Sequence, residues 1–300
     1  MKVLLFGRYV KESNYNSIKQ VIDCALKHDY VVFANQDVYD HLSAIGVDVD
    51  IPLLATHEEL RKQSVNLVMT LGGDGTILQA TTLIRNLAIP ILGVNLGRLG
   101  FLASIEERYI SESFKQIDNS RYELERRRMI FLESSPDLFG DEPFALNDFT
   151  LHKRDTSSMI TIHTYINGDY LNSYWADGLI VSTPTGSTGY SLSCGGPIIF
   201  PNCGNFVITP VAPHNLNVRP LVISDDAVIS FEIEGRTENF LCTLDSRFET
   251  ITSEHQLAVR KCDFDTHLMR LKNTTFLKTI QDKLGWGNDC LLYTSDAADE

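Results

Sequence analysis

In the stretch LVMTLGGDGT at residues 67–76, a glycine-rich turn directly follows an apolar segment. The apolar segment is typical of a buried strand. Beyond the turn, Ile77, Ala80 and Ile84 recur at the spacing of one helix face. The stretch therefore predicts a strand, a tight loop and a helix, with Thr76 as the residue that caps the helix.

Short strand and helix patterns alternate on both sides of this unit. In chain order they are a strand at 3–6, a helix at 18–26, a strand at 30–33, helices at 38–45 and 58–63, and a strand at 91–94. This alternation predicts a parallel α/β domain over residues 1–125.

From residue 126 the pattern changes to short alternating runs separated by turn residues. Asn167-Gly168, between two such runs, is a strong signal of a β-hairpin. We predict a mostly β domain over 126–273 and a helix at 274–285 that packs back on the first domain. Residues 290–300 fit no element and resemble a translated sequencing adapter, so we treat them as a non-native tail. The predicted strands are 144–151, 160–166, 178–182, 227–233, 240–244, 256–261 and 267–271.

The composition excludes several classes of protein. The 300 residues are 43% hydrophobic and 22% charged, which is ordinary for a globular protein. A net charge of -13 argues against a broad nucleic-acid surface. The apolar start at residues 1–6 is too short for a signal peptide, and no segment approaches the roughly 20 apolar residues of a membrane span. The six cysteines match no zinc or disulfide spacing. We expect a cytoplasmic protein with no nucleic-acid or membrane partner.

Asp74 is the first candidate for chemistry. The amides of the surrounding turn and the start of the following helix are suited to bind phosphate. A carboxylate there can accept a proton from a hydroxyl, help to hold a divalent metal, or merely cap the helix. No P-loop and no Rossmann fingerprint occurs in the chain. The other candidates in this turn are Gly72, Gly73, Gly75 and Thr76.

Two further motifs contain asparagine. Asn95 opens the glycine-rich run 95–101 after a predicted strand, where it can bind a ligand, brace the Asp74 loop or serve packing alone. Asn147-Asp148 interrupts an apolar strand pattern. An asparagine can donate and accept at once, as a base edge or a ribose hydroxyl requires. The alternative is a β-bulge at a sheet edge.

The longest motif, DGLIVSTPTGSTGYSLS at 177–193, ends in a loop dense in hydroxyl groups. Neutral hydroxyls suit ribose and phosphate oxygens, and Asp177 adds a carboxylate for ribose or metal. No G-x-S-x-G elbow occurs, which argues against a serine hydrolase. Weaker candidates are Trp175, which can stack on a base or serve packing, and Arg247, which can reach a phosphate; the arginine run 126–128 is expected to be a solvated face, and His214 a structural residue.

These motifs, in this order, resemble those of the NAD kinase family, and the resemblance covers nearly the whole chain. It implies a Rossmann-like N-terminal domain, a C-terminal β-sandwich and an active site between them. It also implies phosphorylation of the 2′-hydroxyl on the adenosine ribose of NAD to give NADP. The donor is ATP or another phosphoryl donor such as polyphosphate, used with Mg²⁺ or Mn²⁺. A homodimer or homotetramer is implied as well.

The resemblance also implies roles for individual residues. Asp74 is the proton acceptor, and Mg²⁺ is bound mainly through the ATP phosphates rather than by a dedicated protein site. Three residues depart from the usual pattern: Asp148 replaces the usual Glu, Gly189 a frequent Ala, and Arg247 a common Gln. These changes bear on substrate affinity and donor preference more than on the reaction. The residues implied to hold NAD are Asp74, Gly75, Asn147, Asp148, Asp177, Thr188, Gly189, Tyr190, Ser191, Leu192, Ser193 and Ala212, with Thr185 beside them.

Two other functions share some of these features. A lipid or sphingoid kinase has the same glycine-rich loop, but it needs an apolar cleft, whereas the stretch 177–193 is polar. A dinucleotide-sensing module would bind without turnover, and the intact Asp74 argues against it.

Overall fold

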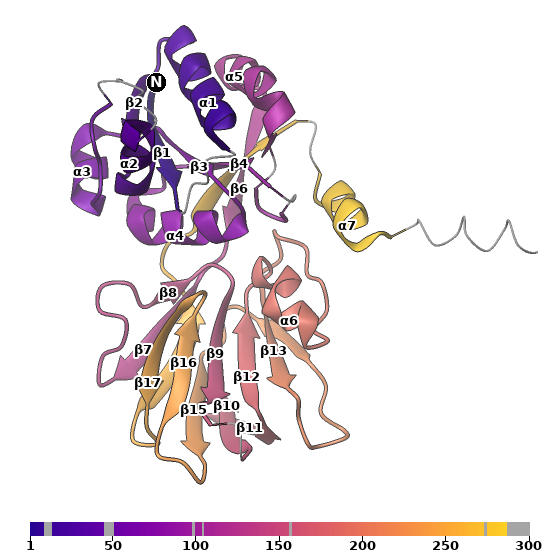
Figure 1. The fold of residues 1–300 in the computed structure, drawn as a ribbon. Helices are drawn as coiled ribbons and strands as arrows, with labels where there is room; N and C mark the ends of the chain where they lie inside the picture. The colour runs from indigo at the N-terminus through magenta and orange to yellow at the C-terminus, as the bar shows by residue number, and fades with distance from the viewer. Residues whose placement is uncertain are drawn as a thin grey trace, which may run out of the picture. The chain divides into compact units, whose positions relative to one another are not determined.

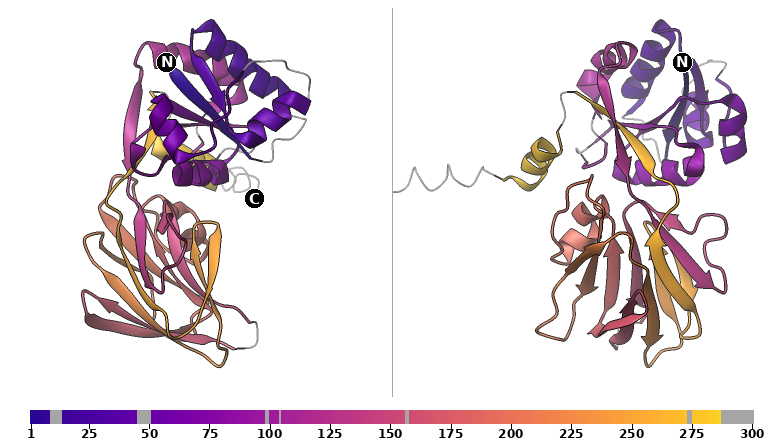
Figure 2. Two further views of the ribbon diagram at one scale, coloured as in Figure 1. Left: turned by 90° about the vertical axis from the view of Figure 1, so that its left-hand side faces the viewer. Right: turned by 180° about the vertical axis from the view of Figure 1, so that it is seen from behind.

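The computed structural model describes residues 1–8, 14–44, 51–97, 100–103, 105–155, 158–272 and 275–286. The chain forms two compact units (Figures 1 and 2). The first contains Met1–Glu125 and the chain from His267 onward, and the second contains Arg126–Thr266.

A mainly parallel sheet forms the centre of the first unit. Its strands run in the order β2-β1-β3-β4-β19-β6, with β5 beside β4, and the pairs β1–β2, β1–β3, β3–β4, β4–β5 and β4–β19 are parallel. This confirms the predicted α/β domain. The strands are β1 (Lys2–Gly7), β2 (Val31–Ala34), β3 (Leu67–Leu71), β4 (Ile91–Asn95), β5 (Ile105–Glu106), β6 (Tyr122–Arg127) and β19 (Thr266–Leu271).

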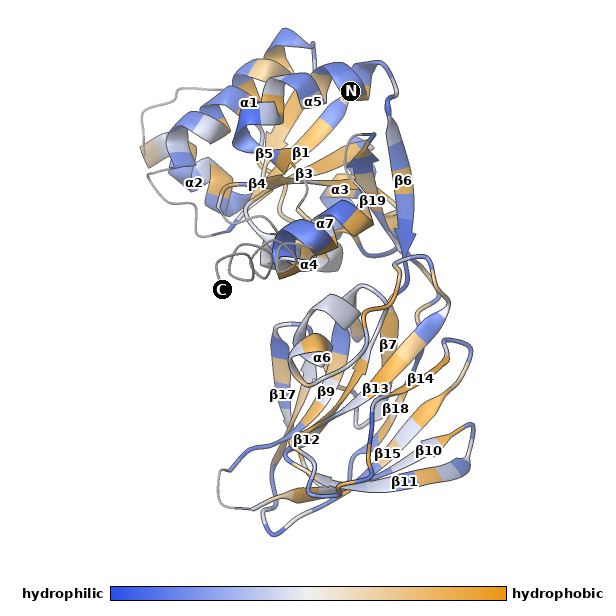
Figure 3. Cartoon of the chain, turned by 90° about the vertical axis from the view of Figure 1, so that its right-hand side faces the viewer, coloured by the Kyte–Doolittle hydropathy of each residue, from blue (hydrophilic) through white to orange (hydrophobic). Residues whose placement is uncertain are grey.

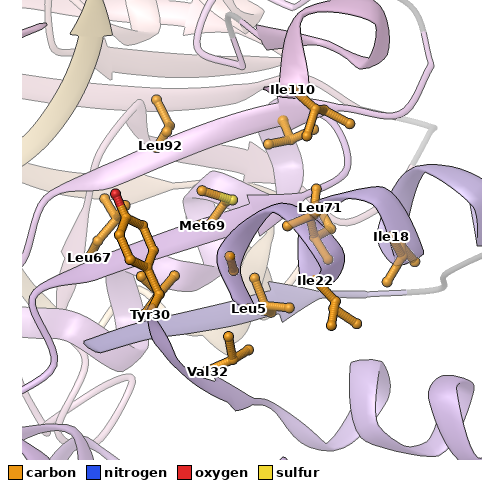
Figure 4. Close-up of a cluster of buried hydrophobic side chains, with 14 of the residues drawn as sticks. Leu5, Ile18, Ile22, Tyr30, Val32, Leu67, Met69, Leu71, Leu92 and Ile110 are labelled. Carbon is orange, nitrogen blue, oxygen red and sulfur yellow. The ribbon is translucent and has the colours of Figure 1, made fainter. Parts of the chain in front are cut away.

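Helices cover both faces of this sheet (Figure 1). On one face, Ile18 and Ile22 of α1 pack with Leu5, Met69 and Leu71 of the strands (Figure 4). Each fully buried side chain of this kind stabilises the fold by about 1.5–3 kcal/mol. The helices are α1 (Tyr15–Lys27), α2 (Gln36–Ala44), α3 (His57–Gln63), α4 (Asp74–Ile84), α5 (Ile110–Asp118) and α7 (Phe276–Leu284), with short 3-10 turns at η2 (Arg85–Leu87) and η3 (Glu107–Tyr109).

Helix α5 was not predicted. Its buried residues Ile110, Phe114 and Ile117 follow the spacing of one helix face, so the signal was present in the sequence.

The second unit consists of two antiparallel sheets. Their orders are β11-β10-β15-β18-β7-β8 and β14-β13-β12-β9-β16-β17. Buried and more exposed residues alternate along strands such as β15 and β16, and apolar residues from both sheets (Figure 3) form one core. The strands are β7 (Ile130–Ser135), β8 (Phe144–Ala145), β9 (Asp148–Lys153), β10 (Ile160–Ile166), β11 (Asp169–Ala176), β12 (Gly178–Ser182), β13 (Asn205–Val211), β14 (Leu221–Ser224), β15 (Ile229–Glu234), β16 (Phe240–Leu244), β17 (Arg247–Ile251) and β18 (Gln256–Lys261); the 3-10 turn η4 (Gly186–Thr188) and helix α6 (Tyr190–Ser193) follow β12.

The predicted hairpin is confirmed, because Asn167 and Gly168 join β10 to β11 with positive φ angles of 52° and 87°. The predicted end of the second domain is wrong. Strand β19 pairs in parallel with β4, at Leu268 opposite Ile91, and so belongs to the first unit. A strand with alternating apolar and polar residues can belong to a sheet of either unit. Only the strand that it pairs with shows which sheet it joins.

The predicted C-terminal helix is present as α7, which is grouped with the first unit. The Thr275 side chain accepts a hydrogen bond from the backbone of Lys278 at its start, and Gly285 ends it in the left-handed region. The tail at 290–300 lies outside the described residues. In the described part of the chain, no helix is long and apolar enough to cross a membrane.

Candidate active site

The glycine-rich turn leads from β3 straight into α4. The helix begins at Asp74, and Gly73 is its N-cap, so the predicted capping role of Thr76 is wrong. Thr76 lies inside the first turn and is buried. A Cβ on Gly72 would overlap the Thr76 hydroxyl, which explains the glycine at that position. Because Gly73 has no side chain to accept hydrogen bonds from the first-turn N–H groups, those groups are suited to an anionic ligand.

The Asp74 carboxylate binds three successive backbone N–H groups. Phe101 donates to it at 2.7 Å, Leu102 at 3.0 Å and Ala103 at 2.9 Å. Gly100 lies so close that a Cβ there would overlap the carboxylate. Asp74 therefore anchors the loop that follows β4, a contact that follows from β3 and β4 being parallel neighbours.

Asn95 has a local role at the end of β4. Its side chain is buried and accepts a hydrogen bond from the Gly97 backbone at 3.0 Å. The predicted brace between Asn95 and the Asp74 loop is absent from the hydrogen bonds of the described residues; the backbone bond from Gly72 to Val94 joins the two loops instead.

Asn35 is a further polar residue of this region, which the sequence motifs do not indicate. It directly follows β2, and its buried side chain bonds both the N–H and the carbonyl of Gly7, at 3.1 and 2.9 Å. Gly7 ends β1, the strand beside β3. Strand β1 has β2 on one side and β3 on the other, so the strand order reverses at β1. Open α/β sheets bind ligands at such a reversal point. A polar residue directly after an apolar strand was the available signal.

In the second unit, Asn147 and Asp148 lie at the break between β8 and β9. Strand β9 lies in mid-sheet between β12 and β16, so the alternative of an edge bulge is wrong. The Asn147 carbonyl accepts a hydrogen bond from Thr183 at 2.9 Å, and a Cβ on Gly186 would overlap that carbonyl. The hydroxyl-rich loop therefore folds directly over the start of β9.

A second carboxylate, not predicted, holds this asparagine-aspartate pair. Asp245, in the turn between β16 and β17, accepts hydrogen bonds from the backbones of Leu146, Asn147 and Asp148 at 2.9, 2.7 and 3.2 Å. Its own N–H donates back to the Asp148 carbonyl at 3.0 Å. Asp245 thereby fixes the backbone from which both side chains project.

Asp148 is only 6% exposed, and its side chain accepts a hydrogen bond from the Thr150 hydroxyl at 3.4 Å. Burial raises the pKa of Asp148 to about 7, and the neighbouring Asp245 carboxylate adds to this shift. Burial also raises the pKa of Asp245, against the lowering effect of its three N–H partners. The Asp148 carboxyl therefore changes its charge near neutral pH.

The hydroxyls of the loop after β12 divide into two sets. Thr183, Ser187 and Ser191 are buried and bond inside the unit: Thr183 to the Leu146 carbonyl at 2.6 Å, Ser187 to Pro184 at 2.6 Å, and Ser191 to the Thr209 hydroxyl at 2.8 Å. Thr185 is buried as well. Thr188, Gly189, Tyr190, Leu192 and Ser193 are partly or fully exposed. The buried set shapes the loop. In the exposed set, the Thr188 hydroxyl donates to the Thr185 carbonyl at 3.1 Å, so its oxygen is left to accept a hydrogen bond from a ligand.

Trp175, near the end of β11, and Asp177 both lie just before the start of β12. The Asp177 carboxylate pairs with Lys153 at 2.5 Å. Trp175 is 45% exposed and packs its ring 4.4 Å from that of His214, whose backbone N–H donates to the Trp175 carbonyl. Ala212, two residues before His214, is in the left-handed region, with φ of 45°.

Comparisons with known proteins identify the family of the chain. Residues 3–122 match the ATP-NAD kinase N-terminal domain, and residues 146–271 match the ATP-NAD kinase C-terminal domain. An NAD kinase of Cytophaga hutchinsonii is 47% identical over 285 residues, which cover 95% of this chain and 98% of the relative. One from Flavobacterium psychrophilum is 43% identical, covering 96% and 99%. This chain belongs to the NAD kinase family.

Two solved structures share the fold of this family member. Yeast NADH kinase complexed with NADH superposes with a TM-score of 0.84 at 23% identity, covering 96% of this chain and 88% of the yeast chain. An NAD kinase from Archaeoglobus fulgidus in complex with ATP gives 0.72 at 21% identity, covering 95% and 98%.

Two of the arginines considered in the sequence analysis make contacts within the second unit of this NAD kinase family member. Arg247 donates to the Glu142 carbonyl at 2.6 Å and to the Phe144 carbonyl, rather than pointing freely toward a phosphate. The prediction that the run 126–128 is a solvated face is wrong for Arg127, which is 1% exposed and lies 3.5 Å from the Thr185 hydroxyl.

Proposed function

We propose that this protein is an NAD kinase, which transfers the γ-phosphoryl group of ATP to the 2′-hydroxyl on the adenosine ribose of NAD. The family match over both domains carries this proposal. The two solved structures are complexes with NADH and with ATP, which are ligands of the same chemical classes. The family match also favours a dinucleotide over a lipid as the acceptor.

Asp74 is the proposed proton acceptor. A ribose hydroxyl is a poor nucleophile, and a carboxylate that takes its proton as the bond to phosphorus forms can accelerate the step about 10²–10⁴-fold. A carboxylate has about four lone-pair sites. Three of them bind the N–H groups of residues 101–103, which orients Asp74 and leaves one site for the hydroxyl.

The residues proposed to contact NAD are those of the motifs that carry the family resemblance. In the first unit the proposed residue is Gly75, at the start of α4. Because its hydroxyl already bonds Thr209, Ser191 supports the site through the shape of α6. The groups proposed to contact NAD are Gly75, Asn147, Asp148, Asp177, Thr188, Gly189, Tyr190, Leu192, Ser193 and Ala212.

A divalent cation is proposed to enter with ATP. Mg²⁺ is usually bound through substrate phosphates and one or two carboxylates. In the ranges that the structure describes, no group of three or more His, Cys, Asp or Glu side chains is placed to hold a metal. When bound, the cation neutralises charge on the transferring phosphate.

Two further properties are proposed from the family resemblance: a homodimer or homotetramer, and a cytoplasmic location. The five cysteines that the structure describes are free thiols, which supports a reducing compartment. Light scattering after size-exclusion chromatography will give the number of subunits.

One assay tests the activity. The protein is incubated with Mg²⁺ and either ATP or polyphosphate, together with NAD, NADH, a diacylglycerol or no acceptor, and the products are resolved by chromatography. We expect NADP from NAD and no phosphorylated lipid. Binding of NAD without any NADP would establish the sensing module instead.

A further inference from the structure

His152 lies against Tyr190 in the second unit and has been given no role so far. The Tyr190 hydroxyl is 2.9 Å from His152 Nε2, and the two rings are almost parallel, at 17° with centroids 5.7 Å apart. His152 is on β9, four residues after Asp148, so both side chains point to the same face of the sheet. Tyr190 is 40% exposed at the start of α6.

The surroundings of His152 determine which ring nitrogen carries the proton. Burial lowers the pKa of His152, and a hydrogen bond to the backbone of Asp177 only partly offsets this, so the imidazole is neutral at neutral pH. A Cβ on Gly178, the residue after Asp177, would lie 2.9 Å from Nδ1, so Nδ1 faces this backbone. With its proton on Nδ1, the ring leaves Nε2 as an acceptor, and Tyr190 must donate to it.

The charged groups near this pair come from three elements. Lys153 on β9 and Asp177 before β12 form an ion pair at 2.5 Å. Directly after α6, the Cys194 thiol shares a side-chain hydrogen bond with Tyr190, and the Asp148 charge acts on both groups. On the β16 side, the residue opposite His152 is the apolar Leu241.

We propose that His152 is a positioning residue, which fixes the hydroxyl proton of Tyr190 and so leaves the Tyr190 oxygen as an acceptor for an O–H or N–H group of the dinucleotide. The inference rests on the proposed function, in which Tyr190 contacts NAD. An oxygen of this kind favours a ribose hydroxyl or a carboxamide N–H and disfavours a phosphate oxygen, which also only accepts.

The test compares four single variants by the KM, the kcat and the dissociation constant for NAD between pH 5 and pH 8. His152→Phe keeps a stacked ring but removes the acceptor, so we expect the KM to rise about threefold to tenfold with kcat within about twofold. His152→Gln restores an acceptor oxygen and should return the KM at pH 8 to within about twofold of wild type. Tyr190→Phe should resemble His152→Phe, and adding the second change to either should cost little more. His163→Phe, the same substitution on β10, is the control and should change nothing.

The pH profile separates positioning from a purely structural role. In the wild type, a second proton on His152 at low pH abolishes the acceptor, so affinity for NAD should fall as the pH drops. The part of this fall in affinity that is due to His152 should be missing from His152→Gln. Asp148 titrates in both proteins, so its effect on the affinity cancels when the two are compared. An unchanged acid limb in His152→Gln, or a wild-type KM in His152→Phe, would overturn the inference even though NADP is formed. If the wild type forms no NADP, the proposed function is wrong; if it also fails to bind NAD, the inference is wrong with it.

Discussion

Two partly exposed carboxylates organise this protein in the same manner, one in each unit. Asp74 binds the backbone N–H groups of Phe101, Leu102 and Ala103, and Asp245 binds those of Leu146, Asn147 and Asp148. Hydrogen bonds to a charged acceptor contribute about 1.5–3 kcal/mol each in net terms. Each carboxylate therefore makes a loop rigid where motif residues lie, and Asp74 is proposed to act chemically as well.

Replacing Asp74 separates these two roles. Asp74→Asn keeps one acceptor oxygen but presents an NH₂ group to the loop, so we expect a loss of stability of about 1–3 kcal/mol. At saturating NAD and ATP, kcat should fall about 10²–10⁴-fold while NAD still binds. Asp245→Asn is the matched control: it should lose similar stability and raise the KM, with kcat reduced less than about tenfold. Near-normal kcat in Asp74→Asn would rule out the proton-accepting role.

Asp148 should make stability depend on pH. Its pKa is raised on folding to about 7, so the folded state binds a proton that the unfolded state has lost between about pH 4 and pH 7. Its contribution to stability is complete at low pH and disappears as the pH rises through 7. Compared with wild type, Asp148→Asn should therefore gain on the order of 2 kcal/mol between pH 5 and pH 8, measured by urea unfolding. Asp169→Asn, an exposed aspartate at the start of β11, should show no such trend. A pH-independent difference for Asp148→Asn would contradict this account.

The periodicity of apolar residues predicts β3 and α4 but not the residue at which the helix begins. Strand β3, the turn after it and α4 follow from residues 67–84, because each pattern is local. Thr76 was predicted as the cap because it is a good capping residue in general. The N-cap is Gly73, three residues before Thr76, so the start of the helix depends on backbone freedom rather than on side-chain preference.

The loop after β4 is sensitive to a single methyl group. Gly100→Ala would push a Cβ into the Asp74 carboxylate, so we expect kcat/KM for NAD to fall at least about tenfold through displacement of Asp74. Gly97→Ala, a change in the same loop where no other atom lies within 4 Å of the new Cβ, should stay within about twofold of wild type. Equal effects of the two substitutions would show that the loop does not position Asp74.

Two separate segments of the chain form the first unit. The second unit is continuous, from Arg126 to Thr266, whereas β19 returns to lie between β4 and β6. A fragment of residues 1–125 therefore lacks a strand inside its sheet, and a fragment of residues 126–266 lacks nothing of its own core.

We expect the fragment 126–266 to unfold cooperatively with temperature and to give dispersed amide signals by NMR. The fragment 1–125 should be partly unfolded or aggregated, because β4 and β6 would each expose an unpaired edge. A mixture of 1–125 with a peptide of residues 264–286 should recover ordered structure. A well-folded fragment 1–125 would show that β19 is dispensable.

Local patterns in the chain were enough to give the α/β and β halves, the hairpin at Asn167-Gly168, and the motifs that indicate the NAD kinase family. The partners of Asp74 and Asp245 and the sheet that receives β19 emerged only from the folded structure. These contacts join residues 27 to 29 positions apart for Asp74 and 97 to 99 for Asp245. Periodicity reports which face of an element is buried, whereas hydrogen bonds between distant loops depend on which strands become neighbours in the sheet.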